Sequence, residues 1–187
     1  MVQIDQQVAD FELEAYHKDE IIKIKLSDYK GKWVVLIFYP GDFTFICPTE
    51  LEEAAHYYDQ FTAAGAEVFS VSTDSKWVHK AWHDESAAIS KVTFPMIADP
   101  TGNLSREFGV YIEAKGQARR GSFIIDPDGV LKTVEIHNND IGRNTKELLR
   151  TLQAAVFVAQ GNGEVCPASW EPGKETLMPG LALVGKI

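Results

Sequence analysis

The sequence predicts an α/β protein with a mixed central sheet flanked by helices, followed by an irregular C-terminal tail. Segments of strand and helix character alternate along the first 160 residues, which is the pattern of a sheet covered by helices. The turn residues Asp126, Pro127, Asp128 and Gly129 separate the last two strand-like runs and predict a hairpin. A hairpin joins antiparallel strands, so the sheet is expected to be mixed.

Each element has its own pattern. Residues 33–39 are an unbroken run of β-branched and aromatic side chains, typical of a strand buried on both faces. The other predicted strands are residues 11–16, 67–72, 96–99, 122–126 and 131–137. Helices are predicted at about 48–64, 75–89, 101–108 and 144–160. The last of these has one apolar face, made by Leu148, Leu152, Ala155, Val156 and Ala159.

The chain has no repeats and no linker long enough to divide it. Residues 1–160 therefore read as one domain. Residues 161–187 differ, because glycines and prolines break regular structure there and Cys166 lies among them. We expect a tail that is weakly tied to the core and able to move.

Composition excludes several classes of partner. The net charge of −9 leaves no basic surface for nucleic acid or an anionic membrane. Asp5, Asp10 and Glu12 interrupt any apolar leader, and no apolar run approaches membrane-spanning length. The expected location is the cytoplasm.

Two cysteines without a secretion signal favour catalytic or transient disulfides over a permanent one. There is no Cys-x-x-Cys pair, and neither cysteine has a second ligand at zinc spacing. His79 and His83 are spaced to share a helix face, but with no third ligand apparent they are predicted to be solvated surface. No glycine-rich nucleotide motif is present either. No metal and no cofactor is therefore expected.

Cys47 follows the predicted strand 33–39 and lies at the start of the next predicted helix. The first turn of a helix has unpaired N–H groups and the positive end of the dipole, which favour an anion. Pro48 suits this turn because its missing N–H is not needed there. Cys47 should therefore ionise readily, although a buried structural cysteine is the other interpretation.

The surrounding motif Pro-x-x-x-Thr-x-x-Cys, formed by Pro40, Thr44 and Cys47, resembles the active-site signature of the peroxiredoxins. The resemblance runs along nearly the whole chain and is strongest to typical two-cysteine peroxiredoxins of the bacterial alkyl hydroperoxide reductase type. Other matching segments are residues 70–74, 79–83, 99–102, 121–126, 163–168 and 183–187.

This resemblance implies a thioredoxin-like fold and a thiol peroxidase that reduces hydrogen peroxide and organic hydroperoxides. Cys47 would become a sulfenic acid, and Cys166 of the partner subunit would condense with it to a disulfide. A homodimer, assembling to a decamer, is part of that expectation. A flavoprotein disulfide reductase or a thioredoxin-like protein would then reduce the disulfide.

The resemblance also assigns roles around Cys47. Thr44 would present its hydroxyl at the helix start, unless it only caps the helix. Pro40 would shield the thiolate, besides ending the strand. Arg120 matches the family's catalytic arginine, whose charge stabilises thiolate and oxyanion, whereas Arg119 is expected to be solvated surface.

Three further residues match supporting positions of the family. Glu50 and Arg143 match an acid and a base that orient the catalytic arginine, although a dipole-stabilised glutamate and a surface arginine would explain them equally well. Trp82 matches an aromatic residue close to the active site, and core packing is its alternative.

Two other functions remain open from the sequence. One is a redox-switched oligomeric holdase that binds unfolded clients, and the other is a cysteine hydrolase, which would need a histidine beside Cys47. Phe43, Phe45 and Trp77 bear on assembly, because they either line a surface that binds another dimer or belong to the core.

Overall fold

The computed structural model describes residues 1–186, and Ile187, the last residue of the predicted tail, lies outside them. A seven-stranded sheet with the order β2-β1-β5-β4-β3-β8-β9 forms its centre. Its strands are β1 Glu12–His17, β2 Glu20–Lys25, β3 Trp33–Phe38, β4 Ala66–Ser72, β5 Met96–Ala98, β8 Arg120–Ile125 and β9 Leu131–His137. Strands β3, β4 and β5 run parallel, and the other pairings are antiparallel. The prediction of a mixed sheet is confirmed.

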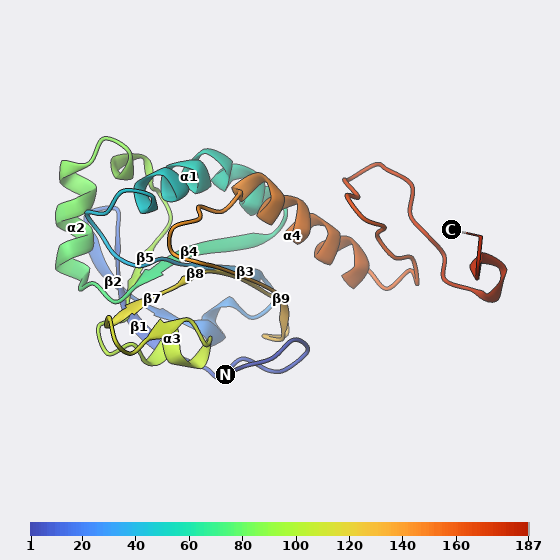
Figure 1. Ribbon diagram of the computed structural model, residues 1–187, viewed down its shortest axis with the longest axis horizontal. Coiled ribbons are helices and arrows are strands. Elements are labelled where there is room, and N and C mark those ends of the chain that lie inside the picture. The colour runs from blue at the N-terminus through green and yellow to red at the C-terminus, as the bar shows by residue number, and fades with distance from the viewer. Residues whose placement is uncertain (187) are drawn as a thin grey trace.

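The helices lie on both faces of this sheet (Figure 1). They are α1 Cys47–Ala63, α2 Lys76–Glu85, α3 Asn103–Glu107 and α4 Thr145–Ala159, with short 3-10 turns η1 Leu26–Tyr29, η2 Ile89–Lys91 and η3 Leu181–Leu183. A small hairpin pairs β6 Tyr111–Ile112 with β7 Gln117–Ala118. None of the helices within residues 1–186 is both long and apolar enough to cross a bilayer.

Strand β3 explains why two layers of helices form. Successive side chains of a strand point to opposite faces. Val35, Ile37 and Tyr39 pack in one core with α1, α2 and α4. Val34, Leu36 and Phe38 pack in a second core that includes Leu104 of α3. Because both faces are covered, the strand needs apolar residues throughout, which is the pattern its sequence shows.

Some predicted boundaries were wrong. The helix expected at 75–89 ends at Glu85, because Ser86 adopts an extended backbone, and η2 follows as a separate turn. The helix expected at 101–108 is limited to Asn103–Glu107. Strand β2 was not predicted at all. It is an edge strand with exposed charged residues, so it lacks a continuous buried pattern.

The tail leaves the end of α4 and projects away from the sheet (Figure 1). Its described part contains one isolated bridge, between Val165 and Leu177, and the short turn η3. Trp170 ties the tail to α4: its ring packs 4.9 Å from that of Phe157, and its carbonyl accepts a hydrogen bond from Arg150 Nη1 at 2.8 Å. The division into residues 1–160 and 161–187 stays a prediction.

Candidate active site

Cys47 is the first residue of α1 and is fully buried. A loop connects the end of β3 to Cys47, and Pro40 lies half-buried near the start of this loop. The helix N-cap, Ile46, makes no side-chain capping bond. The thiol therefore sits at a helix start whose backbone N–H groups are not used by a cap, where a negative charge is favoured.

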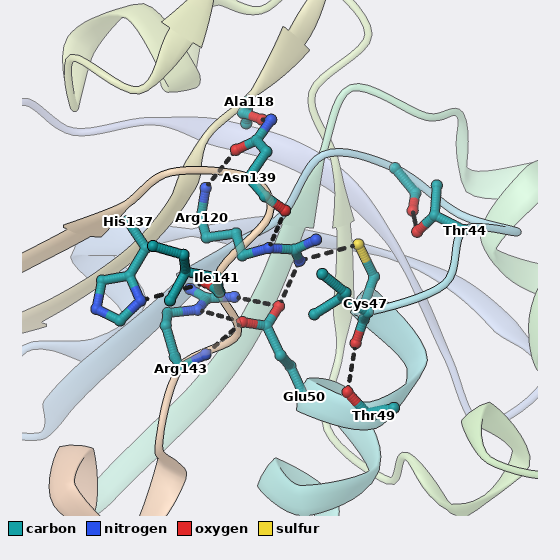
Figure 2. Close-up of polar contacts among 12 residues, drawn as sticks. Thr44, Cys47, Thr49, Glu50, Ala118, Arg120, His137, Asn139, Ile141 and Arg143 are labelled. Carbon is teal, nitrogen blue, oxygen red and sulfur yellow. Dashed lines mark hydrogen bonds and ion pairs between the residues drawn. The ribbon is translucent and has the colours of Figure 1, made fainter.

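Arg120 places a positive charge directly against this thiol (Figure 2). Its Nη1 donates to Cys47 Sγ at 3.3 Å and to a carboxylate oxygen of Glu50 at 2.7 Å. Arg120 is buried, with 3% of its surface exposed, whereas its neighbour Arg119 is exposed. Arg120 is the first residue of β8, whereas Arg119 lies just before the strand with its side chain exposed, so of the two arginines Arg120 reaches the thiol.

Glu50 joins both arginines of the site. Its carboxylate accepts hydrogen bonds from the backbone N, Nε and Nη2 of Arg143 at 2.9, 2.9 and 3.1 Å. Burial alone would raise the pKa of Glu50, but the bonds and charge of Arg143, with the charge of Arg120, outweigh it and lower that pKa. The carboxylate is therefore ionised at neutral pH and fixes both guanidinium groups.

The contacts of Arg120 also keep its guanidinium protonated despite burial. Burial lowers the pKa of Arg120, but its hydrogen bond to Cys47 and its contact with Glu50 more than compensate and raise it. Arg143 completes the cluster by donating from Nη1 to Gly121 O at 2.8 Å and to Ser122 Oγ at 3.2 Å. The residues Cys47, Glu50, Arg120 and Arg143, predicted from distant parts of the chain, thus lie together.

Thr44 does not cap the helix, so that alternative was wrong. Its hydroxyl donates to Gly41 O at 2.9 Å, and the residue is exposed on the loop before α1. Because its proton is committed to Gly41, the Thr44 oxygen can accept a hydrogen bond from a bound molecule.

A buried polar network fixes the loop that carries Thr44. Asp42 accepts from Tyr39 OH at 2.7 Å, and its other oxygen lies 2.7 Å from His79 Nδ1. His79 Nε2 lies 3.2 Å from Ile97 O. Burial raises the pKa of Asp42 despite its bonds to His79. The prediction that His79 is solvated surface was wrong, because α2 turns this residue against the sheet.

Trp82 is buried beside this loop, with its ring centre 6.0 Å from that of Tyr39 and 6.2 Å from that of Phe43. Trp82 belongs to the core and also packs against the loop before Cys47. The structure therefore agrees with core packing and with a position close to the active site. Phe43, Phe45 and Trp77 are 57%, 94% and 62% exposed. Core packing is therefore wrong for these three side chains.

Cys166 lies at a distance from Cys47. It is half-buried, with Sγ 3.9 Å from Ala154 O on α4. Burial raises the pKa of Cys166, partly offset by Arg150. The start of α4 is next to the first turns of α1, since Thr145 N donates to Glu53 at 3.0 Å. From Thr145 to Ala154 the helix covers about 14 Å. The two sulfurs have different surroundings, Arg120 for Cys47 and the side of α4 for Cys166, and both cysteines are free in this conformation.

Asn139 was missed by the sequence analysis. Its carbonyl accepts from Arg120 Nε at 2.9 Å (Figure 2). Asn and Asp residues after a strand, here Asn138, Asn139 and Asp140, are typical of a turn, so the sequence gives no sign of this contact.

Within residues 1–186, no group of three or more His, Cys, Asp or Glu side chains is placed to hold a metal ion. A cysteine hydrolase needs a histidine beside its cysteine. Among residues 1–186, the side chain that is hydrogen-bonded to Cys47 Sγ is that of Arg120 and not of a histidine, so this contact does not support a hydrolase.

Two family descriptions match the chain. That of the AhpC/TSA family matches residues 4–134, and that of the C-terminal domain of 1-Cys peroxiredoxin matches residues 156–181. The second segment contains Cys166, so the chain has a second cysteine despite the name of that domain.

Individual proteins agree with the family match. Alkyl hydroperoxide reductase C of Pseudomonas aeruginosa and that of Bacillus subtilis are each 52% identical over 184 residues, which cover 98% of both chains. Among solved structures, Enterococcus faecalis AhpC gives a TM-score of 0.86 at 48% identity, covering 89% of this chain and 100% of that one. The reduced 2-Cys peroxiredoxin of Plasmodium vivax gives 0.88 at 30% identity, covering 92% and 91%.

Proposed function

Because the chain belongs to the AhpC/TSA family and is a peroxidase of the alkyl hydroperoxide reductase C type, we propose that Cys47 and Cys166 carry its catalytic cycle. Its fold is the thioredoxin-like peroxiredoxin fold. The observation that carries the assignment is the contact between Cys47 Sγ and Arg120 Nη1 at 3.3 Å, at a helix start. A hydroperoxide, hydrogen peroxide or an organic one, is the substrate.

In the first step the Cys47 thiolate attacks one oxygen of the hydroperoxide. The sulfur is oxidised by two electrons to a sulfenic acid, the O–O bond breaks, and the leaving oxygen takes a proton to become water or an alcohol. Arg120 stabilises the thiolate and the negative charge that develops on the oxygens. Thr44 accepts a hydrogen bond from the substrate's O–H, and Pro40 keeps water from the sulfur. Glu50 and Arg143 hold Arg120 in place, and Trp82 supports the loop.

In the second step Cys166 attacks the Cys47 sulfenic acid, an S–S bond forms, and water leaves. We assign this cysteine to the partner subunit of a homodimer. Cys166 lies against Ala154, about 14 Å along α4 from the end of that helix that contacts α1, and a tail that projects from the body can reach a neighbour. Cys47 is fully buried, so the first turn of α1 must unwind before the bond forms.

Oxidised protein is therefore expected to run as a covalent dimer on a non-reducing gel, and as a monomer after reduction. Peptide mapping should find the Cys47 peptide joined to the Cys166 peptide, and a mixture of isotopically light and heavy chains should give mixed light–heavy pairs. Cys166→Ser provides the control, since it should remain a monomer on the same gel. A bridge found only within single chains would contradict the assignment to the partner.

A larger ring, a decamer, is proposed for the reduced dimers. Phe43 and Phe45 are exposed on the active-site loop and Trp77 is exposed on α2, and exposed large apolar side chains of this kind fit an interface. Unwinding around Cys47 would disturb Phe43 and Phe45, so oxidation should weaken this interface. The coupling must be reciprocal: assembly should also favour the reduced, folded site.

Sedimentation should therefore show reduced protein at the mass of a decamer and oxidised protein shifted toward dimers at the same concentration. Phe45→Ala should shift the reduced protein toward dimers as well, because it removes the most exposed of these three side chains. Identical mass distributions in both redox states would refute the coupling, and a reduced dimer would refute the ring.

The cycle closes when a flavoprotein disulfide reductase or a thioredoxin-like protein reduces the disulfide. A thiol cycle of this kind needs a reducing compartment, so we place the protein in the cytoplasm. Both cysteines are free in the structure, which agrees with the reduced state of the enzyme.

A further inference from the structure

The guanidinium of Arg120 is held from two sides. On one side Nη1 contacts Cys47 Sγ and Glu50. On the other side Nε donates to the backbone carbonyl of Asn139 at 2.9 Å. A planar guanidinium with its N–H groups in a fixed fork is oriented only when donors on different edges are engaged. Glu50 fixes the Nη1 edge, and Asn139 fixes the Nε edge.

The side chain of Asn139 explains why its carbonyl is available there. Its Oδ1 accepts from the backbone N of Arg120 at 3.3 Å, and its Nδ2 donates to Ala118 O at 3.4 Å. One amide orientation satisfies both contacts, since Arg120 N needs an acceptor and Ala118 O needs a donor. Arg120 pairs with His137 at the end of β9. The Asn139 side chain thus continues the pairing of β8 with β9 beyond His137. It connects the turn after β9 to the start of β8, where Arg120 lies.

We propose that Asn139 is a positioning residue for Cys47, which ties the turn after β9 to the start of β8 and so aims Nη1 of Arg120 at the thiolate. The inference rests on the proposed role of Arg120 at that thiol. Asn139 carries no charge, so it acts through the direction of the guanidinium. The charged groups that face the thiol and the guanidinium are Glu50 from α1 and Arg143 from the segment before α4, and both are bonded to each other, so we expect them to stay in place when Asn139 is changed.

The test uses Asn139→Ala and Asn139→Leu in a Cys166→Ser background, where only the first oxidation of Cys47 occurs. Asn139→Ala removes both side-chain contacts. Asn139→Leu removes the same contacts but keeps about the same size and adds no charge, which guards against a variant that fails to fold. Asn138→Ala is the matched control, because the side chain of the exposed Asn138 accepts from Asp140 N at 2.9 Å, and its backbone bond from Ile141 N is kept in the variant.

Two readouts are followed: the pH midpoint of the thiolate absorbance of Cys47, and the rate of its first oxidation by hydrogen peroxide. Both Asn139 variants should raise the midpoint and slow the oxidation, by about tenfold for Asn139→Ala, the size of one well-placed hydrogen bond. Asn138→Ala should match the parent. Circular dichroism and oligomer mass should be unchanged in all three.

Arg120→Ala is measured in the same background. It distinguishes the positioning role of Asn139 from the proposed role of Arg120 at the thiolate. If it has a large effect while the Asn139 variants match Asn138→Ala, the positioning role is overturned and the proposed function stands. If Arg120→Ala also leaves Cys47 unaffected, both are overturned. The folded Asn139 variants could also oxidise more slowly without any shift of the midpoint. This result would contradict the inference, because it is the result expected if Asn139 only supports the structure of the turn.

Discussion

Replacing Cys47 with serine is expected to abolish peroxide reduction, whereas Cys166→Ser should still reduce one peroxide per chain and then stop as a sulfenic acid. The two cysteines differ in their surroundings. Cys47 lies at a helix start against a buried arginine, and both features favour the nucleophilic thiolate. Burial raises the pKa of Cys166, so this thiol is a poor first nucleophile in the folded enzyme.

Rapid mixing with a stoichiometric amount of hydrogen peroxide measures this difference. Cys166→Ser should show the same fast phase as the unchanged protein, and a sulfenic acid reagent should then label it. Cys47→Ser should show no fast phase and no labelling. If Cys47→Ser kept the fast oxidation and Cys166→Ser lost it, the roles of the two cysteines would be reversed.

Arg120→Ala is expected to give the second largest effect, a loss of about 10²-fold in the rate of Cys47 oxidation. The substitution removes the charge 3.3 Å from the sulfur, so the thiolate loses the contact that stabilises it and should form only at higher pH. Because pH must then rise further to form the thiolate, the pH–rate profile should move toward alkaline values. Glu50 keeps its bonds to Arg143, so the fold should survive.

Arg119→Ala serves as the matched control, since it removes the same charge from the adjacent residue on the exposed side of the chain. It should leave both the rate and the midpoint close to those of the unchanged protein. Equal effects of the two substitutions would mean that general positive charge, and not the contact of Arg120 with Cys47, controls the thiol.

Local sequence patterns predicted the parts of the fold that depend on local packing. The apolar run at 33–39 became a strand buried on both faces, and the cysteine after it lies at the start of α1. Strand β2 was missed because an edge strand with charged residues has no buried pattern of its own. The ends of α2 and α3 were misplaced because the backbone at a helix end depends on the loop that follows.

Contacts between distant segments could not be read from spacing. The choice of Arg120 over Arg119 came from the family resemblance, and its physical basis, a buried Arg120 at the start of β8 beside an exposed Arg119, is visible only in the structure. His79 was placed on the surface because its sequence gives no sign of which face α2 turns to the sheet. Asn139 acts through its backbone carbonyl and an amide bridge, and such contacts leave no side-chain motif.

A titration of the reduced protein with hydrogen peroxide, counting thiols as well as peroxide, tests the central claim most directly. We predict that each chain consumes one peroxide and loses two thiols, and that a dithiol reductant restores both. Cys47→Ser and Cys166→Ser define the contribution of each residue under the same conditions. Neither a holdase nor a hydrolase requires this stoichiometry, and peroxide that is left unconsumed, or consumed while both thiols remain, would contradict the account.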